Sequence, residues 1–279
     1  MKMPKLFVLL LTSFCLFSLN VQAAQSRIDT ILKRGTLIVG TTGHYPPLTV
    51  ESKTGDLMGL DINIAKLMAK AMGVRARFKK MPIDALLSAV ERGEVDMAMA
   101  GLTITPKRNL RVIFVGPYFV IGQSLLTTKN RIAQIKGPDD MNHPGFRLAV
   151  PEGTTSAEVA RNLAPKATMV RAKNMDEALD MLLSKKVDAV MADQPFCVVA
   201  AFLNKDKDLA ASDPFTFEPL GIALPKEDVL FMNWVQNFLM MIEANGQLKE
   251  LKQYWFSNPQ WMQNLPDSKR RDIMRKPII

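Results

Sequence analysis

The sequence predicts an α/β protein built of two lobes, with a cleft between them. Short apolar runs alternate with helical periods, which indicates sheets flanked by helices. This alternation stops and then starts again halfway along the chain, and a late apolar run can return to the first unit. Because ligands bind outside the carboxyl ends of strands in open α/β sheets, we expect both lobes to present such ends to the cleft.

Residues 1–23 are typical of a secretory signal peptide. A positive start, the apolar run 6–19 and the small residues Ala23 and Ala24 follow one another. The run is shorter than the roughly 20 residues that a bilayer core requires, although a membrane-anchoring start stays an alternative. A lipoprotein is disfavoured, because the residues before Cys15 do not form a lipobox. We therefore expect a periplasmic mature protein that begins near Ala24.

Charge and cysteine content exclude several classes of function. The formal net charge of +9 falls to +7 once the two lysines of residues 1–23 are removed. The basic residues are spread along the chain and aromatic residues do not alternate with them, so we expect solvated surface and no nucleic-acid partner. Cys197 is the only cysteine beyond residues 1–23, and His44 and His143 are the only histidines. The sequence therefore predicts no intrachain disulfide, no metal and no other cofactor.

The first unit alternates strands and helices. A turn around Gly43 ends the first buried strand, Asp61 is placed to cap the first helix, and Gly73 is placed to stop it. This order predicts a mostly parallel sheet with helices on both faces. The expected elements are strands over 36–41, 75–81 and 95–101, and helices over 61–73 and 83–91.

The second unit repeats this alternation before the chain returns. Strands are expected over 146–150, 168–172 and 187–192, and helices over 156–163, 176–185 and 195–203. A return strand over 218–224 precedes a helix that ends at Asn245-Gly246, and a last helix runs through Trp255. We therefore expect lobe 1 in residues 24–124 and 219–257, lobe 2 in residues 125–218, and a C-terminal tail in residues 258–279.

Three polar groups stand where strands are expected to end. Thr105-Pro106 indicates a helix start, which places Arg108 in the first turn, where a guanidinium can hold a carboxylate or be solvated. The segment Thr155 to Glu158 has the pattern of a capping box, and the helix start that it forms can attract an anion. Asp193 follows a buried strand and either caps the next helix or accepts a cationic group.

Several motifs, in order along the chain, carry a resemblance to a known family. They are Gly59-Leu60-Asp61-Ile62-Asn63, Gly101-Leu102-Thr103-Ile104-Thr105-Pro106-Lys107-Arg108, Glu152-Gly153-Thr154-Thr155, Val187-Asp188-Ala189-Val190-Met191-Ala192-Asp193 and Ala244-Asn245-Gly246. Over residues 27–257 the chain resembles the polar amino-acid class of bacterial extracellular solute-binding proteins, family 3, of ABC transporters. The resemblance implies the type II periplasmic binding protein fold, a small zwitterionic ligand such as an amino acid, an ABC permease in the inner membrane as partner, and a monomer.

The resemblance assigns the two charges of the ligand to opposite lobes. Arg108 would hold the carboxylate, helped by Thr103 and by the backbone of Gly101. Asp193 would take the ammonium. Burying both charges is favourable only if each is paired, which gives these assignments a physical reason.

The resemblance also assigns the walls of the site. Thr154 and Thr155 would contact the carboxylate from lobe 2, and Tyr45 would cover the ligand. Ile83 stands where relatives often carry a second aromatic residue, so one side of the site can be aliphatic here. Thr42 stands where binders of cationic amino acids carry an acid, which argues against a lysine-type or arginine-type ligand.

An enzymatic alternative stays open, because the same family includes a secreted cyclohexadienyl dehydratase. Dehydration and decarboxylation of a prephenate-like acid need a general acid in the cleft. In the dehydratase, the resemblance implies, that acid stands three positions after the residue that matches Asp193. In this sequence the position holds Phe196 instead. No other acid is an obvious replacement, although Glu152 lies beside the expected anion site. His44 is expected on the rim of the cleft rather than as a catalyst. The sequence thus predicts a binding protein, with the dehydratase as the alternative.

Overall fold

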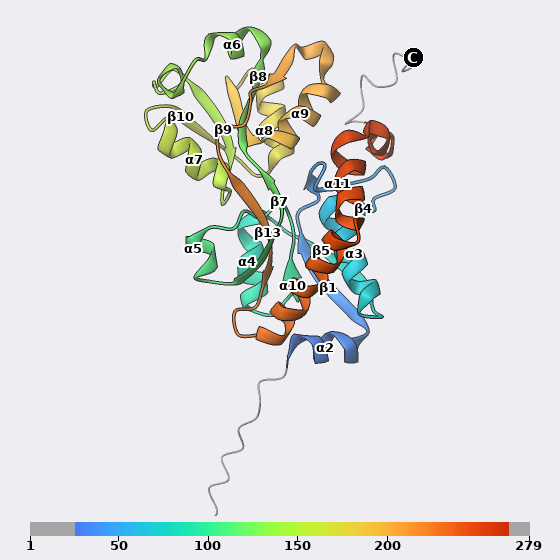
Figure 1. The fold of residues 1–279 in the computed structure, drawn as a ribbon. Helices are drawn as coiled ribbons and strands as arrows, with labels where there is room; N and C mark the ends of the chain where they lie inside the picture. The colour runs from blue at the N-terminus through green and yellow to red at the C-terminus, as the bar shows by residue number, and fades with distance from the viewer. Residues whose placement is uncertain (1–25, 268–279) are drawn as a thin grey trace, which may run out of the picture.

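Two lobes form the molecule, and Figure 1 shows them one above the other, joined by long strands. The structure is a computed structural model that describes residues 26–267. The expected signal peptide in residues 1–23 and residues 268–279 of the expected tail lie outside the described residues. Within residues 26–267, no helix combines the length and the apolar character that crossing a membrane demands.

Lobe 1 is organised around a five-stranded sheet with the order β5-β1-β6-β13-β7. β1 (Thr36–Thr41) pairs in parallel with β5 (Arg75–Lys80) and with β6 (Met97–Ala98). β13 (Glu218–Leu224) runs antiparallel to β6 and to β7 (Ile113–Ile121). The helices that belong to this lobe are α2 (Arg27–Arg34), α3 (Leu60–Ala71), α4 (Ile83–Glu91), α5 (Pro106–Asn109), α10 (Val229–Ala244) and α11 (Gln247–Ser257).

Lobe 2 has a second five-stranded sheet, with the order β10-β9-β11-β8-β12. β9 (Arg147–Pro151) pairs in parallel with β10 (Thr168–Ala172) and with β11 (Ala189–Asp193). β8 (Gln123–Thr128) runs antiparallel to β11 and to β12 (Leu209–Ala211). The helices of this lobe are α6 (Lys129–Gln134), α7 (Thr155–Leu163), α8 (Met175–Leu183) and α9 (Gln194–Leu203).

A small antiparallel sheet follows β1 and carries one wall of the cleft. It consists of β2 (His44–Tyr45), β3 (Thr49–Glu51) and β4 (Leu57–Met58). Strands of two or three residues are too short to give an alternating pattern, so the sequence did not predict them. The short 3₁₀ helices are η1 (Pro138–Asp140), η2 (Lys205–Lys207) and η3 (Pro259–Asn264).

The α/β class and the two lobes are confirmed, and every expected strand and helix has a counterpart. The sheets are mixed rather than mostly parallel, because each contains two parallel and two antiparallel pairings. The cause is the crossing between the lobes: β7 leads directly into β8, and the returning β13 lies beside β7 (Figure 1). The sequence did not predict β7 or β8, the two strands that form this crossing.

The central strand of lobe 2 shows how the fold positions the cleft. β11 is buried along its whole length, as expected for a strand that helices cover on both faces. α7 and α8 both pack against it. The strand ends at Asp193, which therefore lies at the carboxyl edge of the sheet, on a rigid element.

The described part of the tail packs onto the body of the protein. Trp261 is only 1% exposed, and its indole Nε1 donates to the carbonyl of Trp255 at 3.0 Å. The backbone N–H of Lys53 donates to the carbonyl of Asn264 at 2.7 Å. Trp261 and Met262 line a groove that α9 of lobe 2 also lines, so the tail lies along the junction of the lobes.

Candidate ligand-binding site

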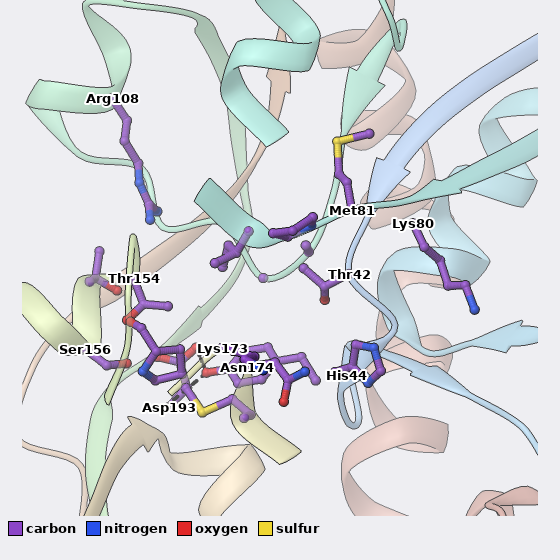
Figure 2. A pocket seen from close by; sticks show the side chains of 18 residues that line it. Thr42, His44, Lys80, Met81, Arg108, Thr154, Ser156, Lys173, Asn174 and Asp193 are labelled. Atoms are coloured by element: carbon purple, nitrogen blue, oxygen red, sulfur yellow. Dashed lines mark hydrogen bonds between the residues drawn. The ribbon is translucent and has the colours of Figure 1, made fainter. Parts of the chain in front are cut away.

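A cavity of ≈ 320 Å³ lies between the lobes, at the edge where the strands end. Seven of the eight residues expected to bind a ligand line it: Tyr45, Ile83, Gly101 and Arg108 from lobe 1, and Thr154, Thr155 and Asp193 from lobe 2. The eighth, Thr103, lies beside the cavity, with its Oγ1 3.3 Å from the Oγ1 of Thr155. The fold therefore brings together residues that are far apart in the sequence, and Figure 2 shows how their side chains converge.

The guanidinium of Arg108 reaches the cavity from a helix start. The hydroxyl of Thr105 accepts from the backbone N–H of Arg108 at 3.2 Å, which confirms the expected cap. Arg108 Nη1 donates to the carbonyl of Thr103 at 3.0 Å, and Nη2 donates to the carbonyl of Gly153 in lobe 2 at 3.1 Å. Burial lowers the pKa of the guanidinium, but an arginine stays charged. These two bonds use two of its five N–H donors, so it can also hold an anion.

The helix start in lobe 2 is capped one residue earlier than expected. Thr154, not Thr155, is the N-cap of α7: its hydroxyl accepts from the N–H of Ala157 at 3.1 Å and donates to the carbonyl of Pro151 at 2.7 Å. The expected capping box is therefore wrong in register, because Glu158 instead pairs with Lys107 across the cleft, at 3.1 Å. The shift leaves the hydroxyl of Thr155 free to face Thr103.

Asp193 turns its carboxylate into the cavity and not onto the helix that follows. It is the N-cap residue of α9, yet its side chain makes no capping bond, so the capping alternative is wrong. Its Oδ1 accepts from Gln123 Nε2 at 2.6 Å, and its Oδ2 accepts from the hydroxyl of Tyr45. Burial raises the pKa of Asp193 to about 7; the Tyr45 bond opposes this, Glu218 adds to it, and Gln123 and Arg108 oppose it.

Tyr45 joins the two lobes at the floor of the cavity. Its hydroxyl reaches Asp193, and its ring stacks on Phe196 of α9 with centroids 5.6 Å apart and planes at 18°. Gly101 makes room for this ring: at φ +63°, a Cβ there would lie 3.2 Å from ring carbons of Tyr45 and 2.7 Å from Leu48 Cδ1. A side chain at position 101 would therefore displace the ring of Tyr45.

Asp61 supports Gly101 from behind the cavity. It was expected to cap α3, but the N-cap is Gly59, and Asp61 is a buried residue of the first turn. Its Oδ2 accepts from the N–H of Gly101 at 2.7 Å, and its Oδ1 accepts from the hydroxyl of Tyr118 at 2.7 Å. Burial raises the pKa of Asp61 to about 7, and the two hydrogen bonds oppose the rise. Sequence reasoning missed this support, although Asp61 and Gly101 both lie in family-like motifs.

The family model for bacterial extracellular solute-binding proteins, family 3, matches residues 37–258. The chain belongs to this family. Cyclohexadienyl dehydratase of Pseudomonas aeruginosa is 26% identical over 258 residues, which cover 91% of this chain and 96% of that protein. The ABC transporter glutamine-binding protein GlnH of Bacillus subtilis is 32% identical over 205 residues, which cover 72% of this chain and 74% of that protein.

The structure of this solute-binding protein is similar to the solved structures of an ancestral amino acid-binding protein, AncCDT-1. One structure of AncCDT-1, described as a precursor of cyclohexadienyl dehydratase, has a TM-score of 0.77 and 37% identity, and covers 83% of this chain and 100% of its own. Another, described as an ancestral cationic amino acid solute-binding protein, has a TM-score of 0.67 and 39% identity at the same coverage. The two-lobed fold that the motifs indicated is thus confirmed. The relatives include both binding proteins and an enzyme.

The other half of this solute-binding protein's cavity is lined by the segment after β1, by β2 and by the end of β5. Figure 2 shows Arg108, Thr154 and Ser156 on one side and Thr42, His44 and Lys80 on the opposite side. His44 Nδ1 lies 2.9 Å from Asp176 Oδ2 of α8, so the expected rim residue bridges the lobes.

Proposed function

We propose that this protein is the periplasmic solute-binding component of an ABC transporter, and that it binds an amino acid or a similar small zwitterion by closure of its two lobes. The observation that carries the proposal is the pair of opposite charges in one cavity, Arg108 from lobe 1 and Asp193 from lobe 2. An α-amino acid presents a carboxylate and an ammonium on one carbon, and it can satisfy both lobes at once. Its binding would therefore favour the closed arrangement.

Contacts between the lobes support closure around such a ligand. Arg108 reaches the carbonyl of Gly153, and Tyr45 reaches Asp193, each across the cleft. Asp193 ends β11, and Thr103, before the helix of Arg108, forms a bridge with Leu220 of β13, so both charges are tied to a sheet, which is what a site of defined geometry requires. In the proposed complex the guanidinium and the start of α7 receive the carboxylate, Asp193 receives the ammonium, and Tyr45 covers the ligand.

The proposal includes export and a membrane partner. The signal-like residues 1–23 would be removed, and the soluble, monomeric mature chain would deliver its ligand to an ABC permease in the inner membrane. Fractionation of the native host should release the protein with the periplasm. Retention in the membrane pellet after a high-salt wash would contradict this part of the proposal.

Calorimetry on the mature chain tests the clamp. A thermal-shift screen of the twenty amino acids first finds the ligand, since a ligand at about 100 times its Kd stabilises the fold by roughly 2.7 kcal/mol. Arg108→Ala should then cost about 3–5 kcal/mol, because it leaves the ligand's carboxylate unpaired, which is a loss of affinity of roughly a hundredfold to several thousandfold.

Arg111→Ala is the matched control, since Arg111 is exposed and pairs with Glu91 away from the cavity. It should change affinity by less than about twofold, as expected for a surface pair. Circular dichroism checks that both variants fold. A folded Arg108→Ala protein that binds within tenfold of the parent would show that the clamp is wrong.

We also propose that the protein is not a dehydratase. The cavity lining described here contains one carboxyl group, Asp193, which Tyr45 and Gln123 hold. Phe196, at the position where the resemblance places the dehydratase's acid, is buried against Tyr45. Incubation with prephenate or arogenate should therefore give no product above the uncatalysed rate. Turnover on the order of 10 per second, an ordinary enzyme value, would favour the enzymatic alternative instead.

A further inference from the structure

The half of the cavity that faces away from Arg108 offers hydrogen-bond donors. The Oγ1 of Thr42 is buried and has no hydrogen-bond partner among residues 26–267. Asn174 uses its Oδ1 to accept from the N–H of Glu177 at 2.9 Å, so its amide NH₂ is the group left for the cavity. Lys173 precedes it and also lines the cavity. All three groups can donate to a ligand that carries an acceptor at this end.

The same half carries positive charge and, among the lining residues described, no acid. Apart from Asp193, Tyr45 and the Arg108 of the other half, the ionisable residues that line the cavity are Lys80, Lys173 and His44. The acids that pair with two of them do not line it: Glu51 Oε2 lies 2.7 Å from Lys80 Nζ, and Asp176 holds His44. A guanidinium or ammonium on the ligand's side chain would therefore enter without a counter-ion, beside like charges, at a cost in desolvation and repulsion.

Between the two polar ends the wall is apolar. Met81, Ile83 and Met175 line this stretch, and the cavity of ≈ 320 Å³ is at the small end of the range for small-molecule sites, about 300–1,000 Å³. A wall of this kind suits a short run of methylene groups. This apolar wall offers no hydrogen-bond partner to a polar side-chain atom that lies next to the ligand's α-carbon.

We propose that the ligand is an amino acid whose side chain is a short aliphatic arm ending in a hydrogen-bond acceptor, a carboxylate or a carboxamide, and that Thr42, Lys173 and Asn174 recognise this acceptor. The inference rests on the proposed function, because it takes the α-carboxylate and the ammonium to be held by Arg108 and Asp193. It separates this chain from AncCDT-1, one structure of which is described as a cationic amino acid solute-binding protein.

Calorimetry of the mature protein with glutamate, glutamine, arginine, lysine and leucine tests the inference. Glutamate or glutamine should bind at least about tenfold more tightly than the other three, which corresponds to roughly 1.4 kcal/mol. If arginine, lysine or leucine binds more tightly, the inference about the side chain is wrong and the proposed function stands. If none of the twenty amino acids binds, the inference is wrong, and the proposed function would require a zwitterion outside the twenty.

Two substitutions then test the recognising groups. Thr42→Val keeps the shape and removes the hydroxyl, so it should weaken the binding of the preferred ligand about fivefold to tenfold and leave leucine unchanged. Lys173→Met should weaken the binding of glutamate more than the binding of glutamine, because only glutamate loses a charge pair. Lys166→Met, an exposed lysine of the same lobe that does not line the cavity, is the control and should change neither. Folded Thr42→Val and Lys173→Met proteins that bind glutamate and glutamine like the parent would overturn the assignment.

Discussion

The ionisation of Asp193 predicts that ligand binding weakens as the pH falls. In the protein without ligand, burial raises the pKa of this carboxyl group to about 7. The ligand's ammonium binds the ionised form, so the complex should hold Asp193 ionised to a much lower pH. Affinity should therefore be full above pH 7 and should be lost as the pH falls through 7, where the free protein takes up a proton that the ligand must displace.

The size of the effect follows from the pKa. With a pKa of about 7, the ionised fraction of Asp193 is about 0.9 at pH 8 and about 0.01 at pH 5, so Kd should rise roughly ninetyfold between these values. At about 1.4 kcal/mol per tenfold, this is about 2.7 kcal/mol of binding free energy. Calorimetry at several pH values, in buffers of different ionisation enthalpy, measures both the change in Kd and the release of about one proton at pH 5.

A substitution isolates the group responsible. Asp193→Asn resembles the protonated acid in shape, so at pH 8 it should bind about a hundredfold more weakly than the parent, and its Kd should change little between pH 8 and pH 5. Arg111→Ala should keep the parent's profile. A parent protein whose Kd is constant from pH 8 to pH 5, or an Asp193→Asn protein that keeps the ninetyfold change, would refute the reasoning.

Three further predictions concern stability. The raised pKa of Asp61 means that its contribution to stability is lost as the pH rises through about 7; thermal unfolding without ligand should give a higher Tm at pH 5 than at pH 8, and Asp61→Asn should reduce this difference. Trp261→Ala should lower the free energy of unfolding by about 3–5 kcal/mol in denaturant titrations, whereas Tyr254→Ala, at a side chain 40% exposed, should cost less than about 1 kcal/mol. Gly101→Ala should destabilise the protein by more than Gly73→Ala, because both have left-handed backbones but only a Cβ at position 101 meets neighbours; equal losses in the same titrations would contradict this.

Local pattern in the sequence was enough to predict most of the fold. The helix over Ile83–Glu91 and the strand over Glu218–Leu224 have the bounds that were expected. Each is a run with one clear periodicity between turn residues. The missed strands are of two kinds: β2, β3, β4 and β12 contain two or three residues each, and β7 and β8 form the crossing between the lobes. β7 pairs with β13, and β8 pairs with β11 and β12, and all of these partners are distant in the sequence.

The sequence predicted those residues of the candidate site whose position follows from a local pattern. Arg108 follows a Thr-Pro helix start, and Asp193 ends a buried strand, so local pattern together with the family resemblance was sufficient for both. Gln123 was not predicted, since it meets Asp193 only through the pairing of β8 with β11. Asp61 was assigned to a cap because its bond to Gly101 joins residues 40 positions apart. Such contacts follow from sheet register and cannot be read from local spacing.

The two ends of the cavity are formed by different kinds of structure. This difference explains why sequence identity to a relative does not mean that both proteins bind the same ligand. Asp193 ends β11, and the segment that leads to Arg108 is tied to β13 by the bridge between Thr103 and Leu220. Thr42 and Lys173 stand in the connections that follow β1 and β10. A side chain in a connection can change without disturbing the sheets, so the end that faces the ligand's side chain can change while the zwitterion clamp is kept. Arg108→Ala should therefore weaken the binding of every amino acid alike, whereas Thr42→Val should weaken the binding only of those amino acids whose side chain carries the acceptor.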